Sequence, residues 1–486
     1  MSLHVRLSPE AQARLDAMRR NSTISSILVA LITLFVIGLL LALISIKSLF
    51  METPVIVSYS ATEQKEEEVI ATKKISTNTK QKPTAPSSAI ARVIAAATTS
   101  NLAIPLPDEE MSQPSTDFGN GDDFEHGWGS IGDGGGDGGF GGLPDTMRKR
   151  CSKNERLQRL AQTGGNVQCE EAVLKALRWM KKSQNPDGSW NGLKKSAMTG
   201  LGILAYLGHC ETPSSKEFGE SCLMAMTYLI NVGMQKQGKL ADNIMDQNWC
   251  YEHAICVYAL AEATIFCKEL NITVPNLQEV TQKSGQFLID NQHQSGGWDY
   301  GYSRSSPRGG DVSIVGWHLQ ALKAMKITGL EFNNLPHSIE KGLEFLEDKQ
   351  HSNGGFGYFS KEHLEFQDYH HLTGVGTLCF QLWDKDAEKV RHGIKHIQQN
   401  SKLKFRTPNC NLYAHYYEAQ AMMNFGGEAW KHYNRIMRDE VLKNQKPDGT
   451  WNSSQVPDDR PNFYDTALCT LMLEVYYRYL PGTATK

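Results

Sequence analysis

The sequence has no surplus of positive charge and lacks the short motifs of several enzyme classes. Its 486 residues carry 50 Lys and Arg against 53 Asp and Glu, which gives a formal net charge of -3. A nucleic-acid-binding protein would show a basic excess, so nucleic acid is excluded as a partner. The chain contains no H-E-x-x-H, G-x-S-x-G or P-loop motif, and its ten cysteines include no C-x-x-C pair. We therefore predict no cofactor and assign no metal ligands.

One long apolar run stands near the start of the chain. No charge occurs between Arg20 and Lys47, and Ile24 to Ile46 is almost wholly apolar. At 1.5 Å per residue this run is long enough to cross a hydrocarbon core of about 30 Å. The residues before it carry more positive charge than those after it, which predicts a cytoplasmic N-terminus. We expect a cytoplasmic segment (1–23), a transmembrane helix (24–46) that contacts the lipid bilayer, and an extracytoplasmic or periplasmic remainder on the cytoplasmic (inner) membrane.

The next stretch has the composition of a linker. Residues 47–165 are rich in Thr, Ser and Pro and then in Gly and Asp, with no apolar periodicity that would build a core. Half of the residues from Gly119 to Gly142 are glycine, and the aspartates among them lack the regular ligand spacing of a calcium loop. We predict a disordered linker of about this extent.

From residue 166 onward a motif recurs. The pattern Q-x-x-x-G-x-aromatic occurs four times, and two further copies keep only part of it. Fixed-period similarity of this kind is the signature of a repeat architecture. In each unit an apolar-periodic helix precedes the Gln, a turn of Pro, Gly or Asn follows, and a second helix rich in small residues comes next. The six glutamines are Gln184, Gln235, Gln292, Gln350, Gln399 and Gln445.

Six helix pairs predict an all-α (α/α)6 toroid over residues 166–486. The motifs and their spacing resemble the repeat family of squalene and oxidosqualene cyclases and of protein prenyltransferase β-subunits. Stretches such as Tyr251 to Ala263, Gly310 to Trp317 and Thr466 to Pro481 are similar to a membrane-anchored bacterial group known by these repeats alone. The resemblance covers about 320 residues and implies the toroid fold, whereas a fold of this kind hosts several functions.

The sequence departs from the catalytic motifs of that family. It has no Asp-x-Asp-Asp, the acid with which the cyclases protonate a double bond. The Asp-x-Cys zinc pair of the prenyltransferases corresponds to Asp311-Val312-Ser313, where Ser replaces the Cys ligand, and the third ligand would be His370 or His371. The resemblance therefore leaves open whether the protein catalyses a reaction.

Polar and aromatic residues collect where the second helices of the repeats begin. In toroids of the resembled family these helix ends face a central cavity, so we take them as the candidate site. Asp311 and Asp465 have an alternative role as N-caps or first-turn residues, and Arg304 and Arg308 are either an anion site or solvated loop residues. The candidates for catalysis are Asp311, Glu252, His253, His371 and Asp465; those for ligand binding are Trp249, Tyr251, Trp298, Trp317, Tyr413, His415, Tyr464, Arg304 and Arg308.

Three functions compete at this level. The first is a membrane-anchored toroid whose central cavity binds an apolar, isoprenoid-like ligand. The second is a non-catalytic module that binds an envelope protein, and the third is an enzyme or binder for polysaccharide, with Tyr300 and Tyr358 among its stacking aromatics. Cys151 and Cys169 flank the start of the repeats and are candidates for a disulfide in an oxidising compartment, whereas cysteines within apolar helices are expected to be core residues.

Overall fold

The computed structural model describes residues 55–56, 150–362, 371–454 and 462–478. The chain divides into two compact units, Met1–Val55 and Ile56–Lys486, and all described helices belong to the second. Within these described ranges, no helix combines the length and apolarity needed to cross a membrane. The predicted span from Ile24 to Ile46 lies outside them, as does His370.

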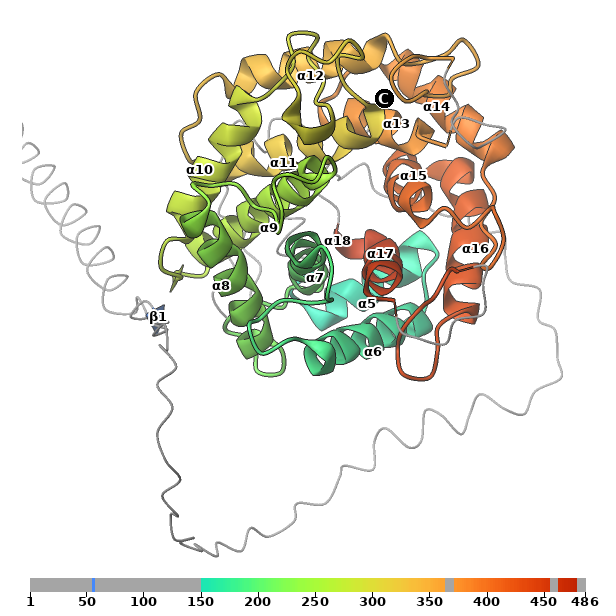
Figure 1. Cartoon of the computed structure of the whole chain (residues 1–486). Helices are drawn as coiled ribbons and strands as arrows, with labels where there is room; N and C mark the ends of the chain where they lie inside the picture. Colours follow the sequence, from blue (N-terminus) through green and yellow to red (C-terminus); the bar gives the residue numbers. More distant parts are fainter. Residues whose placement is uncertain (1–54, 57–149, 363–370, 455–461, 479–486) are drawn as a thin grey trace, which may run out of the picture. The chain divides into compact units, whose positions relative to one another are not determined.

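Six helices form an inner ring and six form an outer ring in the described part of the second unit (Figure 1). Each inner helix packs against the inner helices before and after it, and the last packs against the first. The all-α toroid predicted from the repeats is therefore confirmed. The inner helices are α7 (Lys195–Gly208), α9 (Trp249–Glu269), α11 (Val312–Thr328), α13 (Thr373–Leu382), α15 (Leu412–Phe425) and α17 (Phe463–Leu473).

The outer helices bury one stripe each, whereas the inner helices are enclosed on nearly all sides. In α12, for example, Leu335, Ile339, Leu343 and Leu346 are buried at helical spacing, as expected of an amphipathic helix. Almost every residue of α9 is buried, which explains the small residues in that stretch. The outer helices are α6 (Val167–Ser183), α8 (Gly219–Gln235), α10 (Leu277–Asp290), α12 (Leu335–Glu347), α14 (Ala387–Asn400) and α16 (Gly427–Lys443).

The repeated Gln, Gly and Trp residues join neighbouring repeats. Gln292 Nε2 donates to the carbonyl of Gly296 in its own turn (2.7 Å) and to that of Ser338 in the next outer helix (2.9 Å). Gly296 has a φ of 93°, and a Cβ there would lie 2.0 Å from the backbone oxygen of Lys341. Trp298 Nε1 donates to the Leu288 carbonyl at 2.9 Å. The motif is thus a structural joint, and Gln184, Gln350 and Gln445 make the same pair of bonds.

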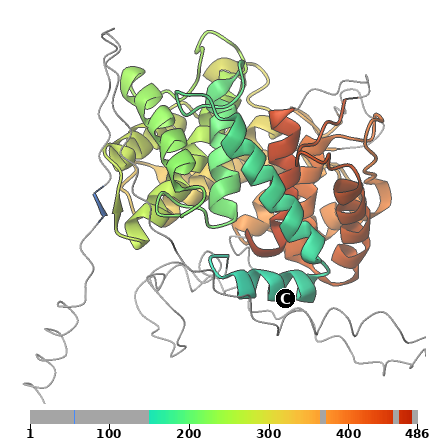
Figure 2. The ribbon, with the colours of Figure 1, turned by 90° about the horizontal axis from the view of Figure 1, so that it is seen from below.

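Helix α5 (Lys153–Thr163) lies across the face where the inner helices end (Figure 2). It packs against the short helix α18 (Val475–Arg478), which follows α17 directly. Residues 153–163 fall within the predicted linker 47–165, yet they are helical because Ser152 caps the helix and Leu160 is buried in the toroid. The remaining elements are the 3-10 turn η2 (Tyr300–Tyr302) and the two-residue strands β1 (Val55–Ile56) and β2 (Ile272–Thr273).

The cysteine pairing differs from the one expected. Cys151 forms a disulfide with Cys210, in the loop between α7 and α8, and Cys169 is a buried free thiol in α6. Proximity along the chain suggested the Cys151–Cys169 pair, but α6 turns Cys169 into the core. The expectation that cysteines within apolar helices are core residues is confirmed, for instance at Cys256 and Cys379.

Candidate functional site at the N-terminal mouth of the inner ring

Five half-buried tyrosines gather at the end of the toroid where the inner helices begin, which we call the mouth. Three of them occupy the first turns of inner helices, one lies in η2 and one lies in the segment before α13. Burial raises the pKa of Tyr251 and Tyr413, and the nearby Tyr300, Tyr358 and Tyr464 raise it further. We name this set the tyrosine cup; its members are Tyr251, Tyr300, Tyr358, Tyr413 and Tyr464.

Hydrogen bonds connect the cup to the start of α11. The hydroxyl of Tyr251 lies 2.6 Å from Ser313 Oγ and 3.3 Å from the hydroxyl of Tyr300. Ser313 in turn donates to the carboxylate of Asp311, and Tyr413 donates its hydroxyl proton to the Ser313 carbonyl. Four elements, α9, η2, α11 and α15, thus meet in one hydrogen-bonded cluster.

Tyr358 and His371 extend this cluster towards α13. The hydroxyl of Tyr358 lies 2.7 Å from His371 Nε2, and the Tyr358 carbonyl accepts the backbone N–H of Val312 at 2.9 Å. His371 is buried, and this contact at Nε2 fixes the orientation of its imidazole ring. The structure therefore brings Asp311 and His371, which the sequence selected separately, onto the same side of α11.

Asp311 is both the N-cap of α11 and a member of the mouth. Its carboxylate accepts the backbone N–H of Ser313 at 2.9 Å, and its residue is 2% exposed. Burial raises the pKa of this carboxyl more than its hydrogen bonds with Ser313 lower it. Asp465 has a raised pKa for the same reason, but it lies in the first turn of α17, with Asn462 as the N-cap. A helix start stabilises the charged form of a carboxyl and so lowers its pKa. The positions of Asp311 and Asp465 at helix starts therefore do not explain why their pKa values are raised.

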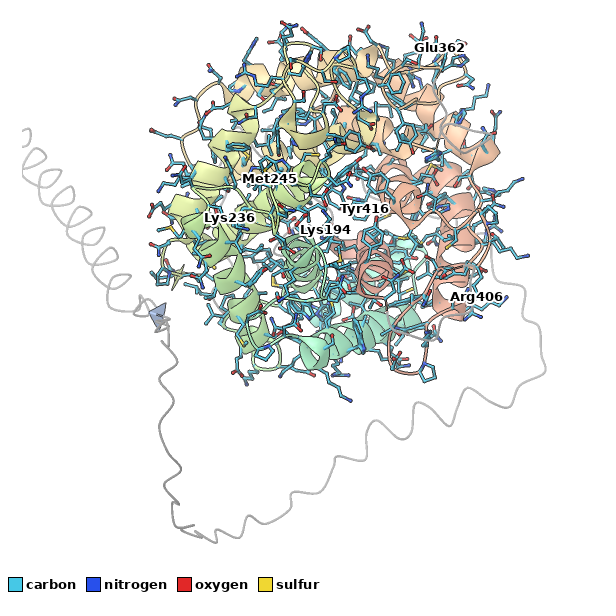
Figure 3. The ribbon with its side chains drawn as sticks, in the orientation of Figure 1. Lys194, Lys236, Met245, Glu362, Arg406 and Tyr416 are labelled. Carbon is cyan, nitrogen blue, oxygen red and sulfur yellow. A yellow bond between two sulfur atoms is a disulfide. The ribbon has the colours of Figure 1, made fainter. Side chains whose placement is uncertain are left out.

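A second polar group lies between α7 and α9. Lys194 bridges Asp246 (2.5 Å) and Glu252 (2.9 Å), and Glu252 also accepts the backbone N–H of Asp242. Burial raises the pKa of Glu252 despite this pairing. Figure 3 shows Lys194 near the middle of the ring. Lys194 is not among the candidates predicted from the sequence, because it precedes α7 and its partners Asp246 and Glu252 lie more than 50 residues further along the chain.

The two candidate arginines differ in their surroundings. Arg308 pairs with the buried Asp299 at 2.5 Å, and its guanidinium lies 4.9 Å from the centre of the Tyr300 ring. The Asp299 carboxylate thus neutralises the charge of Arg308, and the flat face of the guanidinium lies over the Tyr300 ring of the tyrosine cup. Arg304 is exposed on the same loop.

Four other candidates point away from the mouth, towards the outer helices. His253 accepts the Leu240 N–H and donates to the Ser284 carbonyl, and burial lowers its pKa to about 3. His415 contacts the Tyr433 hydroxyl of α16 (3.0 Å) and the Lys402 carbonyl. Both ring nitrogens of each histidine are therefore occupied by structural contacts. Trp249 and Trp298 are buried against α10 in the same layer.

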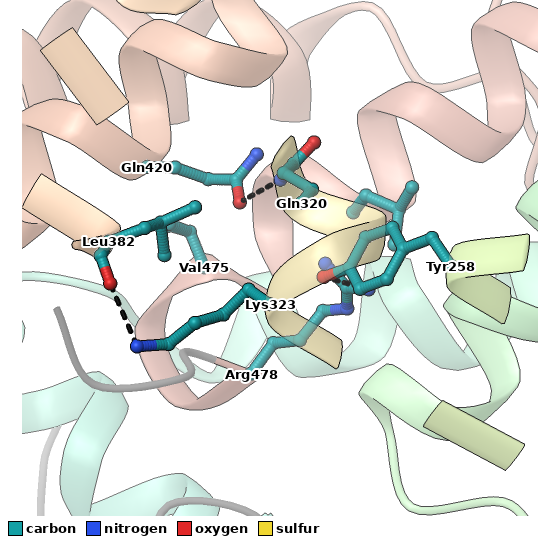
Figure 4. Close-up of a pocket in the computed structure, with 8 residues that line it drawn as sticks. Tyr258, Gln320, Lys323, Leu382, Gln420, Val475 and Arg478 are labelled. Carbon is teal, nitrogen blue, oxygen red and sulfur yellow. Dashed lines mark hydrogen bonds between the residues drawn. The ribbon is translucent and has the colours of Figure 1, made fainter. Parts of the chain in front are cut away.

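Aromatic rings fill the axis below the cup. Trp317 stacks on Tyr416 with ring centroids 5.1 Å apart, and both are fully buried. Beneath them a cavity of about 10 Å³ remains (Figure 4), which is the space of a single water molecule. Its wall contains both polar and apolar side chains and is formed by Tyr258, Gln320, Lys323, Leu382, Gln420, Leu471, Val475 and Arg478. Among the described residues, this cavity is too small for the apolar ligand expected from the sequence, and Trp317 and Tyr416 pack against each other above it.

The part of the chain with described coordinates holds no group of three His, Cys, Asp or Glu residues that would bind a metal ion. The chemistry open to the mouth is thus that of phenol hydroxyls, aromatic faces, one buried carboxyl and one imidazole. These groups suit a ligand that both stacks and accepts or donates hydrogen bonds.

Several solved structures share the toroid shape with this chain. The type II terpene cyclase MstE from Scytonema matches with a TM-score of 0.44 and 11% identity, over 65% of this chain and 98% of the cyclase. The GH76A α-1,6-mannanase from Salegentibacter sp. matches with a TM-score of 0.47 and 8% identity, over 63% of this chain and 98% of the mannanase. A protein from Actinoplanes matches with a TM-score of 0.40 and 13% identity, over 64% and 99%. Likeness at this level says nothing about activity. No protein-family model matches the sequence, and no curated protein matches it.

Proposed function

We propose that the toroid is the binding part of a membrane-tethered protein and that its mouth binds a small molecule with an apolar body and a hydroxyl head, such as an isoprenoid alcohol. The observation that carries this proposal is the hydrogen-bonded cluster at the start of α11, in which Tyr251 and Tyr413 bond to Ser313 and Ser313 bonds to Asp311. Tyr300 joins this cluster through the hydroxyl of Tyr251. Tyrosine supplies an apolar face and a polar tip at once, which is what such a ligand requires.

The packing of aromatic side chains along the axis of the inner ring limits where the ligand would lie. Because Trp317 and Tyr416 fill the space below the cup, the ligand would rest at the mouth, with its apolar part over the tyrosine rings. Its hydroxyl would exchange hydrogen bonds with the cluster of Tyr251, Ser313 and Asp311. Burial of Asp311 favours a protonated carboxyl, which has a hydrogen bond to give as well as to accept.

The membrane tether and the extracytoplasmic location are part of the same proposal. The apolar run from Ile24 to Ile46 and the arginines before it support an anchor with this orientation. The disulfide between Cys151 and Cys210 supports an oxidising compartment for the toroid. Protease treatment of intact cells, followed by immunodetection, tests the orientation: the toroid should be digested from outside while residues 1–23 are protected.

Ligand binding is tested by native mass spectrometry of the full chain in detergent, with farnesol and a manno-oligosaccharide as separate probes. We expect a farnesol adduct with the wild type and an affinity about fivefold weaker for Tyr300→Ala, since one aromatic contact contributes about 1 kcal/mol. Tyr228→Ala on α8 is the matched control, because this half-buried tyrosine is not a member of the tyrosine cup.

The double variant Asp311→Asn with His371→Gln tests whether these two residues bind the ligand or only stabilise the fold around the start of α11. Lost farnesol binding with unchanged stability supports the proposal. Binding of the oligosaccharide alone would overturn the ligand class in favour of a carbohydrate, and no adduct with either probe would favour an interaction module for an envelope protein.

A further inference from the structure

A second hollow lies at the opposite end of the toroid, between α5 and the loop that joins α7 to α8. Its volume is about 400 Å³, within the range of ligand-binding pockets. Hydroxyl, ammonium and carboxylate groups line it. We call it the latch pocket; its residues are Cys151, Lys153, Arg156, His209, Cys210, Glu211, Thr212, Ser214, Ser215, Lys216 and Glu217.

The sulfur atoms in this pocket are more accessible than almost all others. Cys151 and Cys210 are both half-buried and form part of the pocket wall. Of the eight free cysteines, seven are buried and only Cys410 is half-buried. A thiolate that approaches from solvent therefore reaches the Cys151–Cys210 bond before it reaches the core thiols.

The surroundings of the disulfide favour its cleavage by a thiolate. The residues that line the pocket include Lys153, Arg156 and Lys216 as well as Glu211 and Glu217, and His209 lies next to Cys210 between Glu170 and Glu211. Positive charge near a sulfur stabilises the thiolate that leaves during exchange. Cys210 also has a φ of 65°, a left-handed conformation that is strained for a residue other than glycine.

The disulfide holds only one end of α5. The other end is fixed to α16, because the Thr163 carbonyl accepts from Trp430 Nε1 at 2.7 Å and the Gly164 carbonyl accepts from Asn434 Nδ2 at 2.8 Å. At the disulfide end, Arg150 inserts its guanidinium 3.9 Å from Glu262 and 5.2 Å from the Phe266 ring centre. Loss of the S–S bond thus leaves α5 attached at its C-terminal end, while only the non-covalent contacts of Arg150 and Arg156 remain at its N-terminal end.

We propose that Cys151–Cys210 is a reducible latch, and that the latch pocket admits the active-site dithiol of a reducing protein. The attacking thiolate forms a mixed disulfide with one cysteine and releases the other as a thiolate, which takes a proton from solvent. The second thiol of the reductant then resolves the mixed disulfide, so the reductant becomes a disulfide and Cys151 and Cys210 become thiols. The consequence is local opening at the N-terminal end of α5, with the ring of helices intact.

The full chain in detergent is treated with reduced thioredoxin as the dithiol-protein probe, and thiols are identified by alkylation and mass spectrometry. We expect Cys151 and Cys210 to be alkylated while the circular dichroism of the toroid is retained. Hydrogen exchange should rise about tenfold in α5 and stay unchanged in α6 and α16. Reduction that occurs only with loss of the toroid signal, or unchanged exchange in α5 after reduction, would overturn the proposal.

A pocket-filling variant tests the docking step by itself. Ser214→Trp adds bulk at an exposed position of the latch pocket, and Ser352→Trp adds the same bulk at an exposed position outside it. Thioredoxin should reduce the Ser214→Trp protein about tenfold more slowly than the Ser352→Trp control, while a small phosphine reduces both at similar rates. Equal rates with thioredoxin would show that the pocket plays no part in access.

Discussion

Gln445 and Ala172 are hydrogen-bonded across a sequence separation of 273 residues. The side-chain amide of Gln445, in the last repeat, donates to the Ala172 carbonyl of α6 at 2.8 Å. Each complete motif makes this bond to the next outer helix, and here the next helix is the first. The toroid is thus closed by the same joint that connects its internal repeats.

Loss of the closing joint should lower stability. Gln445→Met keeps the side-chain length but leaves the carbonyls of Ala172 and Gly449 without this donor, so we expect the free energy of unfolding to fall by about 1–3 kcal/mol. Gln399→Met is the matched control, because this copy of the motif is exposed, and its effect should stay within about 0.5 kcal/mol. Urea denaturation measures both, and equal losses would contradict a special role for Gln445.

The turn glycine of the last repeat should resist substitution. Gly449 has a φ of 95°, and a Cβ there would lie 2.6 Å from the backbone oxygen of Lys175. Because a backbone atom cannot move aside cheaply, Gly449→Ala should destabilise the toroid by more than about 1 kcal/mol. Gly192→Ala is the control, since no atom lies within 4 Å of its Cβ position. Thermal unfolding followed by circular dichroism compares the two.

Stability should depend on pH through His209. Burial lowers the pKa of this imidazole, but its hydrogen bonds with Glu170 and Glu211 outweigh burial and leave the pKa raised. A raised folded-state pKa means that the protonated form stabilises the fold, fully below about pH 6.5, and that this contribution is lost as pH rises through the folded-state value.

The measurement is the unfolding free energy at a series of pH values for the wild type and for His209→Gln. The difference between the two proteins should be largest at the acidic end, above the pH at which Glu170 protonates, and should shrink towards alkaline pH. A difference that grows with pH would show that His209 is buried as the neutral form.

Asp311 should reveal its raised pKa in the same kind of experiment. Asn retains the capping oxygen, so Asp311→Asn removes the buried charge without removing the cap. The protonated carboxyl is the more stable form in the fold, and this stability is lost as pH rises through the folded-state pKa. The variant should therefore gain stability relative to the wild type as pH rises, whereas Asp311→Ala should lose about 1 kcal/mol through the missing cap. A constant difference between Asn and Asp across the pH range would contradict the raised pKa.

The repeats were predictable from the sequence because the residues of each motif lie close together in the chain. Each Gln, turn glycine and aromatic residue lies within seven positions, and the turn itself requires a residue that tolerates positive φ. The capping role of Asp311 follows from its place before an apolar-periodic stretch in the same way.

Other features of the site depend on contacts between distant parts of the chain, which the local sequence pattern does not reveal. An inner helix is buried on nearly all sides, so periodicity does not tell which residues face the axis. His253 and His415 were candidates for this reason, although both contact the outer helices. The stacking of Trp317 on Tyr416 joins α11 to α15 and closes the axis, which only the folded chain shows. The Cys151–Cys210 pairing likewise depends on where the loop after α7 lies.

The position of the disulfide also sets the mechanical behaviour of the molecule. Cys151 precedes α5 in the chain, and its partner Cys210 lies in the loop after the first inner helix. Tension applied to the chain before Arg150 would pass through the covalent S–S bond into the α7–α8 loop and bypass α5 altogether. With the bond oxidised, the force acts on the ring of helices. With the bond reduced, it acts on α5, and the contacts of α5 with α16 and α18 would break one after another.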